Sequence, residues 1–159
     1  MKFSIAAAAG LFAALTTALP EAFTLVADGG KTVLTDGQKL LIGADPASHE
    51  ILILRSSNAT TGVSFTSKDQ TPTGFQTLYV VDGQVAPVGL TLPHSGATPE
   101  GASLDGFGVD KDGYFTHDGK NYFGIEGYGD NPERVINWVD GHSSTQRIAN
   151  LWVKECKGC

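Results

Sequence analysis

The fold is indicated most clearly by one stretch in the second half of the chain. It reads Val109-Asp110-Lys111-Asp112-Gly113-Tyr114-Phe115-Thr116-His117-Asp118-Gly119-Lys120-Asn121-Tyr122-Phe123. Its two Asp-Gly pairs stand between short runs rich in aromatic and β-branched residues. Aspartate tolerates, and glycine readily adopts, the positive φ angles that tight hairpin turns need. The stretch therefore predicts two consecutive antiparallel hairpins, residues 109–115 and 115–123, that form a meander.

The same pattern extends over most of the chain. Asp-Gly pairs also occur at 28–29, 36–37, 82–83, 105–106 and 140–141, and residues 79–85 read as a third hairpin. No segment has a convincing helical period, although residues 99–103 have room for one helical turn. Strands are predicted at residues 23–27, 32–34, 39–43, 51–55, 63–66, 75–81, 85–90, 108–110, 114–117, 122–126, 134–139 and 148–154. Short strands with regular turn signals predict an all-β, single-domain antiparallel β-barrel or sandwich built of short hairpins.

The N-terminus indicates a secreted protein. Met1 and Lys2 give a short basic start, residues 3–15 are apolar or small, and Thr16-Thr17-Ala18 supplies small residues for a signal peptidase. The apolar run is too short for a membrane span, which needs about 20 residues. Residues 1–18 are therefore predicted to be a signal peptide, and residues 19–159 a secreted all-β domain with no membrane span.

Composition excludes several classes of protein. The chain has 159 residues, 41% of them hydrophobic, which is too many for a disordered chain. A formal net charge of −6 argues against a nucleic-acid partner, because binding to phosphates requires clustered lysine and arginine. Only 2 cysteines are present, so a disulfide-dense scaffold is excluded as well.

A family resemblance rests on the order of these strand and turn signatures. These signatures lie in the segments 77–83, 108–116, 118–120, 138–139 and 150–153. In this order the chain resembles small secreted fungal PhiA-like cell-wall proteins and the β-barrel hypersensitive-response elicitors of plant-pathogenic fungi. The resemblance implies a non-enzymatic protein of the hyphal wall, or an apoplastic effector recognised by a plant-surface receptor. Family members often carry cysteines through the body of the chain, whereas here both lie at the C-terminus.

The last four residues are Cys156-Lys157-Gly158-Cys159. Secretion favours their oxidation, and a bridge between them requires a turn, which Gly158 makes easy. A disulfide between Cys156 and Cys159 is predicted; intermolecular or wall-linked disulfides are the alternative. Asn58-Ala59-Thr60 is the only N-glycosylation sequon, so Asn58 is predicted to be a glycosylation site on a surface loop.

Aromatic residues gather between positions 114 and 128. Aromatic faces stack on sugar rings, and neighbouring aspartate and asparagine side chains bind hydroxyl groups, so a fungal wall polysaccharide is one expected partner. The candidate sugar-contact residues are Tyr114, Tyr122, Tyr128, Asp118 and Asn121. The alternative is that these aromatics form core and cross-strand pairs. Trp152 is predicted to lie in the core.

No motif for catalysis, a cofactor or a metal is present. The histidines have no metal-ligand spacing, and no serine lies in a nucleophile elbow. Aligning Gly113 with an EF-hand loop fails, although a looser cation site at Asp110 and Asp112 stays open. The sequence therefore predicts that the protein is not an enzyme. The alternative is a small secreted hydrolase or lectin acting on wall glycans, whose paired carboxylates would come from among Asp105, Asp110, Glu126 and Asp130.

Overall fold

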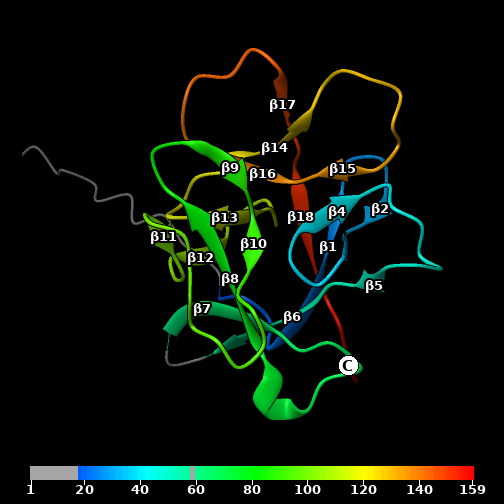
Figure 1. Ribbon diagram of the computed structural model, residues 1–159, viewed down its shortest axis with the longest axis vertical. Helices are drawn as coiled ribbons and strands as arrows, with labels where there is room; N and C mark the ends of the chain where they lie inside the picture. The colour runs from blue at the N-terminus through cyan, green and yellow to red at the C-terminus, as the bar shows by residue number, and fades with distance from the viewer. Residues whose placement is uncertain (1–17, 58–59) are drawn as a thin grey trace, which may run out of the picture.

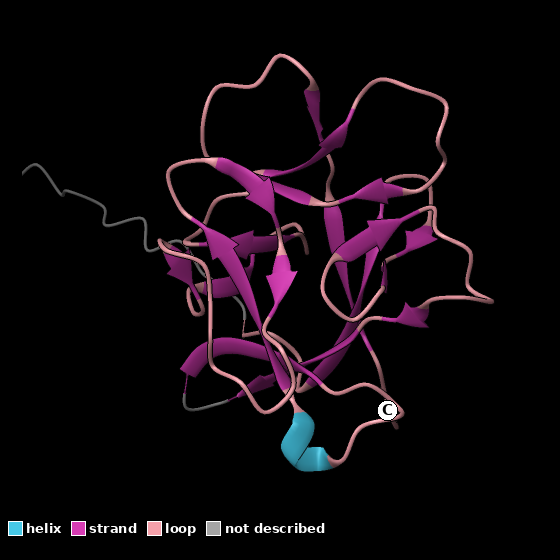
Figure 2. Ribbon diagram, viewed as in Figure 1, coloured by secondary structure: helices cyan, strands magenta, loops and turns pink. Residues whose placement is uncertain are grey.

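The protein is all-β, with antiparallel sheets made of short strands, as the sequence predicted. The computed structural model describes residues 18–57 and 60–159. The one helical element in these ranges is a single 3-10 turn, η1 (Pro72–Gly74), drawn in cyan in Figure 2. Residues 99–103 form no helical turn and instead contain a strand, β11 (Ala102–Ser103). The arrangement of the sheets is consistent with a β-sandwich.

The largest sheet has eight strands and includes the first and last strands of the described chain (Figure 1). Two further strands pair outside its main path, β11 (Ala102–Ser103) with β8 and β2 (Lys31–Thr32) with β1. Along the main path the order is β10 (Gly89–Leu90), β8 (Gln76–Val81), β7 (Thr60–Phe65), β6 (Ile53–Ser57), β1 (Ala22–Ala27) and β18 (Leu151–Glu155).

Three smaller sheets complete the fold. One four-stranded sheet has the order β17 (Gln146–Ile148), β14 (Phe123–Glu126), β16 (Asn137–Val139) and β9 (Val85–Pro87). The other has the order β15 (Arg134–Val135), β4 (Leu40–Ile42), β3 (Leu34–Thr35) and β5 (Glu50–Ile51). A two-stranded sheet consists of β12 (Phe107–Val109) and β13 (Phe115–His117).

Beside a small second cluster of Leu34, Leu41 and Ala44, the buried apolar side chains form one large hydrophobic core. Phe115 of β13 lies at its centre, with ring centroids 5.9 Å from Phe23, 5.5 Å from Phe107 and 5.5 Å from Phe123. Trp138 packs edge-on against Phe123 at 5.2 Å. All five aromatic side chains are at most 3% exposed, so strands from three different sheets are held together by the burial of these rings.

The hairpin over residues 109–115 is confirmed, because β12 and β13 pair antiparallel. The Asp-Gly turn at 118–119 is also present: Asp118 and Gly119 both have positive φ, and His117 and Lys120 exchange backbone hydrogen bonds of 3.0 and 2.9 Å. Six of the seven Asp-Gly glycines have positive φ, the exception being Gly141.

Two predicted hairpins do not form as strand pairs. After the turn at 118–119, β14 pairs with β16 and β17 instead of with β13. After the turn at 82–83, β9 pairs with β16, while β8 pairs with β10, β11 and β7. The partners of β14 and β9 are strands distant in sequence that bury apolar side chains in the core. They therefore lie where the neighbouring strand of a simple hairpin would pair. The predicted hairpins over residues 115–123 and 79–85 are therefore wrong.

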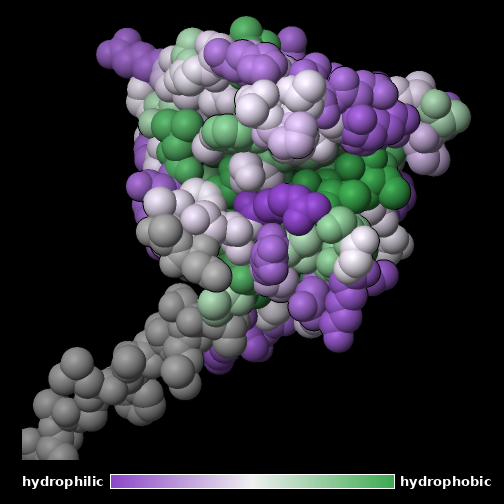
Figure 3. Space-filling model, turned by 90° about the horizontal axis from the view of Figure 1, so that it is seen from below, coloured by the Kyte–Doolittle hydropathy of each residue, from purple (hydrophilic) through white to green (hydrophobic). Residues whose placement is uncertain are grey.

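Large apolar side chains are also exposed at scattered positions. Figure 3 shows apolar patches separated by polar surface on the face seen from below. In the described residues, the exposed large apolar side chains are those of Ile51, Phe75, Val85, Leu92, Tyr122, Tyr128, Ile148 and Trp152. Within the same residues, no helix is long and apolar enough to cross a membrane.

Candidate functional site

Two aromatic side chains meet on the outer face of β18, the exposed Trp152 of that strand and the half-buried Tyr114. Trp152 is 47% exposed, whereas its neighbour Leu151 is fully buried. The prediction that Trp152 lies in the core is therefore wrong. Successive side chains of a strand point to opposite faces, so the strand that turns Leu151 and Val153 towards the core turns Trp152 outwards.

The turn between β12 and β13 holds the Trp152 indole in place. The Tyr114 ring meets the indole edge-on, with centroids 5.4 Å apart and an interplanar angle of 87°. The backbone N–H of Val153 donates to the Gly113 carbonyl at 2.9 Å. A Cβ atom at Gly113 would lie 3.0 Å from a ring carbon of Trp152, so glycine allows the indole to approach the chain closely.

Polar side chains adjoin this aromatic pair. The Asn121 side-chain amide donates to Asn150 Oδ1 at 2.9 Å. The Asn150 backbone N–H donates to Asp28 Oδ2 at 3.1 Å, and its side-chain amide donates to the same oxygen at 3.3 Å. Asn150 lies two residues before Trp152, so this network joins the predicted sugar-contact residue Asn121 to the strand that carries the indole.

The other predicted sugar-contact residues lie in different surroundings. Tyr122 is 44% exposed, with its ring 5.6 Å from Trp138 and the Lys120 ammonium 5.4 Å from the ring centroid. Tyr128 is 68% exposed in the loop after β14, where its carbonyl accepts a hydrogen bond from Arg134. Asp118 lies beside His117. The structure thus brings Tyr114 and Asn121 close to Trp152 and leaves these other three residues apart from that strand.

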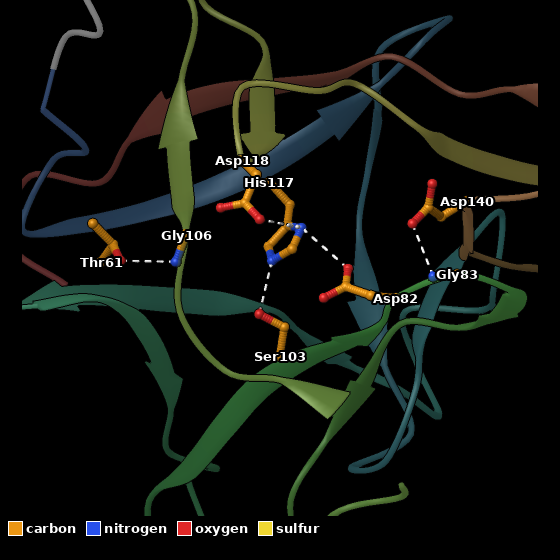
Figure 4. Close-up of polar contacts among 8 residues, drawn as sticks. All are labelled: Thr61, Asp82, Gly83, Ser103, Gly106, His117, Asp118 and Asp140. Carbon is orange, nitrogen blue, oxygen red and sulfur yellow. Dashed lines mark hydrogen bonds and ion pairs between the residues drawn. The ribbon is translucent and has the colours of Figure 1, made fainter. Parts of the chain in front are cut away.

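His117 is the centre of a second group of polar side chains (Figure 4). Its Nε2 lies 3.1 Å from the Ser103 hydroxyl, and its Nδ1 lies 3.8 Å from Asp82 Oδ1 and 4.0 Å from Asp118 Oδ2. The ring is 1% exposed and packs edge-on against Trp138 at 5.1 Å. Serine, histidine and aspartate therefore meet in the order of a hydrolase triad.

The geometry of this cluster suits a structural link better than acyl transfer. A triad needs the aspartate within hydrogen-bonding distance of Nδ1, and 3.8 Å exceeds that distance. It also needs N–H donors for an oxyanion, and two backbone N–H groups drawn beside this cluster in Figure 4 are bound within the chain. Gly106 donates to the Thr61 hydroxyl at 2.7 Å, and Gly83 donates to Asp140 Oδ2 at 2.8 Å. The Ser103–His117 contact thus connects β11 to β13.

Replacing Ser103 by alanine tests this role. The change leaves the buried Nε2 of His117 without its partner, and an unsatisfied buried polar group costs about 1–3 kcal/mol. Urea unfolding should show a free energy of unfolding lower by that amount. Ser48→Ala is the control, because the Ser48 hydroxyl is exposed and its loss should change stability by less than about 0.5 kcal/mol. Equal stability of the two variants would contradict a structural role for the contact.

Two of the acidic candidates from the sequence, Asp110 and Glu126, accept hydrogen bonds within the chain. Asp110 Oδ1 accepts from the backbone N–H groups of Asp112 and Tyr114, both at 2.9 Å. Glu126 Oε2 accepts from the Gln146 side-chain amide at 3.4 Å. Over residues 18–57 and 60–159, no group of three or more His, Cys, Asp or Glu side chains could hold a metal ion.

The predicted disulfide is present between Cys156 and Cys159, whose Cα atoms are 5.7 Å apart. Hydrogen bonds hold both ends of this disulfide-closed loop against the rest of the protein. The Cys156 backbone N–H donates to the Ala22 carbonyl at 2.9 Å, and the Arg55 guanidinium donates to the Cys159 carbonyl at 2.8 Å. The predicted glycosylation site, Asn58, lies outside the described residues.

Reduction of this disulfide should have a modest effect. The bridge closes a short loop with a sequence separation of 3, and the chain-entropy relation gives about 2 kcal/mol for a loop of that size. We expect the double variant Cys156→Ser/Cys159→Ser to unfold in urea with a free energy lower by about 2 kcal/mol or less. If this variant did not fold, the disulfide would be essential. That result would contradict a fold stabilised mainly by its hydrophobic core.

No protein-family model matches this chain, and neither the curated proteins nor the solved structures contain a match to it.

Proposed function

We propose that this chain is a secreted, non-enzymatic protein of the fungal hyphal wall, or of the surface where a fungus meets a plant host, and that it acts by surface contact. Export rests on the signal-peptide pattern of residues 1–18, and the C-terminal disulfide is compatible with an oxidising extracellular environment. The wall or host setting rests on the order of strand and turn signatures in the sequence.

The observation that supports action by contact is the exposed position of Trp152. Tryptophan is enriched at binding surfaces, where it supplies a large apolar area together with a polar N–H. Here the indole lies outside a sheet whose other face is core, and the turn at Gly113 and Tyr114 fixes its orientation. A rigid, half-exposed tryptophan costs little ordering entropy when it meets a partner.

The alternative of a small secreted hydrolase has one structural argument, the meeting of Ser103, His117 and Asp82. The contact-acting proposal predicts that Ser103→Ala, at a temperature where it stays folded, keeps all wall or host activity of the wild type. A hydrolase using Ser103 would instead lose nearly all turnover on wall glycan esters.

The proposal is tested by locating the protein. Antibody against the chain should detect it in the washed wall fraction or the culture medium of the producing fungus, without the first 18 residues. Detection only inside the cells, with those residues still attached, would contradict the proposal.

The host branch of the proposal is tested by infiltrating purified secreted chain into leaves at micromolar dose, with heat-unfolded chain as the control. Cell death or a defence response that depends on the folded chain would favour the effector role. If the leaf does not respond to the folded chain, the effector role is contradicted and only the wall role remains.

A further inference from the structure

Trp152 belongs to a continuous row of side chains that crosses three strands and ends at a fourth segment. In the antiparallel register, Thr32 of β2 lies opposite Val26 of β1, and Val26 lies opposite Trp152 of β18. Trp152 in turn forms a β-bridge with Tyr114. Directly opposed residues point to the same face of a sheet, so these four side chains lie side by side. We call Thr32, Val26, Trp152 and Tyr114 the aromatic row.

The row lies on the outer face of the sheet. Its residues are exposed or half-buried, whereas Phe23, Leu25 and Leu151, which point the other way from β1 and β18, are fully buried. Strands in a sheet are spaced by about 4.8 Å, so the row is about 14 Å long. The strands β1, β2 and β18 that carry most of it are neighbours in Figure 1.

Polar groups flank the row on both sides. One flank has Asp28 and Asn150, which are hydrogen-bonded to each other. The other has Thr24 and Lys154, which lie opposite each other in the register of β1 and β18. Several polar groups of this face make no hydrogen bond or ion pair within residues 18–57 and 60–159, namely the Trp152 indole N–H, the Thr24 and Thr32 hydroxyls, the Tyr114 hydroxyl and the Lys154 ammonium group.

We infer that the aromatic row is a binding platform for a neutral polysaccharide, with the Trp152 indole as its stacking surface. The inference rests on the proposed function and names the partner of the contact surface. A sugar ring presents C–H groups on its face and hydroxyl groups around its edge. An indole flanked by free donors and acceptors matches both parts, the ring by apolar contact and the hydroxyls by hydrogen bonds.

The shape of the row favours a polymer over a small sugar. Small-molecule sites are concave and enclose most of the ligand, but the aromatic row lies along the outer side of a sheet. An extended polysaccharide needs only a line of contacts, and a row about 14 Å long lets neighbouring sugar units rest on it together.

The size and charge of this face exclude other partners. Thr24 and Asp28 are four residues apart, which is roughly 14 Å along an extended chain. With the length of the row, about 14 Å, the face has an area of about 200 Å². A stable protein interface buries about 800 Å² on each partner. The formal net charge of −6 disfavours an acidic polymer, and the flanks contribute one acid and one base, Asp28 and Lys154.

The test uses the chain secreted by a yeast host and five probes: insoluble β-1,3-glucan, chitin and cellulose, isolated hyphal walls, and polygalacturonate as an acidic polymer. We expect the wild type to bind at least one neutral glycan and not polygalacturonate. Trp152→Ala should weaken that binding tenfold or more, and Trp152→Phe should keep most of it because an aromatic face remains. Phe75→Ala is the matched control, because Phe75 is 55% exposed and directly precedes β8, which is far along the sheet order from β18.

A second variant, Thr32→Glu, places a bulky charge in the row at an exposed strand residue and should also weaken binding. It keeps the inference testable if Trp152→Ala does not fold. Equal binding by wild type and both variants would overturn the inference while leaving the proposed wall function intact. The inference would also be overturned if the chain bound polygalacturonate alone, or bound no glycan. Binding to isolated walls that is lost after the walls are treated with protease would overturn it too, because the partner would then be a wall protein. The location of the protein then decides the proposed function separately.

Discussion

Replacing Phe115 by alanine is expected to lower the free energy of unfolding by about 3–5 kcal/mol, the range for deleting a buried phenylalanine ring. Phe115 is fully buried, and its ring contacts Phe23, Phe107 and Phe123, which belong to three other strands. The cavity would therefore open where the sheets meet. Because domains of this size are stable by about 5–15 kcal/mol, the loss is a large fraction of the total.

Urea unfolding followed by tryptophan fluorescence measures this effect. Phe75→Ala is the control, since it deletes the same ring at a position that is 55% exposed. That variant should lose less than about 1 kcal/mol. If Phe115→Ala and Phe75→Ala were equally stable, Phe115 would not lie at the centre of the core.

Replacing Gly43 by alanine should lower the free energy of unfolding by about 2–5 kcal/mol, from two additive causes. Gly43 has φ +74°, a left-handed conformation that costs an L-residue about 1–2 kcal/mol. The new Cβ would also overlap the backbone carbonyl oxygen of Pro132, in the loop before β15. A backbone atom cannot rotate away, so β4 and β15 would have to shift, with an overpacking cost of about 1–3 kcal/mol.

Gly29→Ala separates the two causes. Gly29 has φ +83°, but a Cβ atom there would meet nothing within 4 Å. It should therefore show the conformational cost alone, and the difference between the two variants measures the overlap at Pro132. Equal unfolding free energies for Gly29→Ala and Gly43→Ala would show that the loop before β15 yields without cost.

The local structure of this protein could be predicted from the sequence to a large extent. Each of the twelve predicted strand segments overlaps a strand of the structure. Period-2 alternation and Asp-Gly turns are local signals, and the structure retains them, as the tight turn at Asp118 and Gly119 shows. The strand β11 escaped prediction because its loop is rich in glycine and proline, and its two residues become a strand only by pairing with β8.

The pairing of the strands could not be predicted in the same way. Which strand lies beside β9 or β14 depends on the burial of aromatic residues that are distant in sequence, such as Phe123 and Trp138. The meeting of Ser103, His117 and Asp82 has the same origin, because it requires β11 to pair with β8. One signal was available: His117 shares a strand face with Phe115, so alternation places it towards the core.

The candidate contact surface was predicted in part. The sequence names Tyr114 and Asn121 as candidate contact residues, and the structure places Tyr114 against Trp152 and Asn121 against Asn150. The sequence also predicts Trp152 in the core, because it stands among apolar residues. The assignment fails for a physical reason, since one strand cannot turn Leu151, Trp152 and Val153 to the same face. The register of β18 against β1, which sets the neighbours of Trp152, becomes visible only in the folded chain.

The most direct test of contact with a wall is co-sedimentation of the purified secreted chain with isolated hyphal walls at physiological salt. We expect the wild type in the wall pellet, its release by soluble β-1,3-glucan or chitin fragments, and Trp152→Ala largely in the supernatant. A wild-type chain that stays wholly in the supernatant would contradict the proposed contact with the wall.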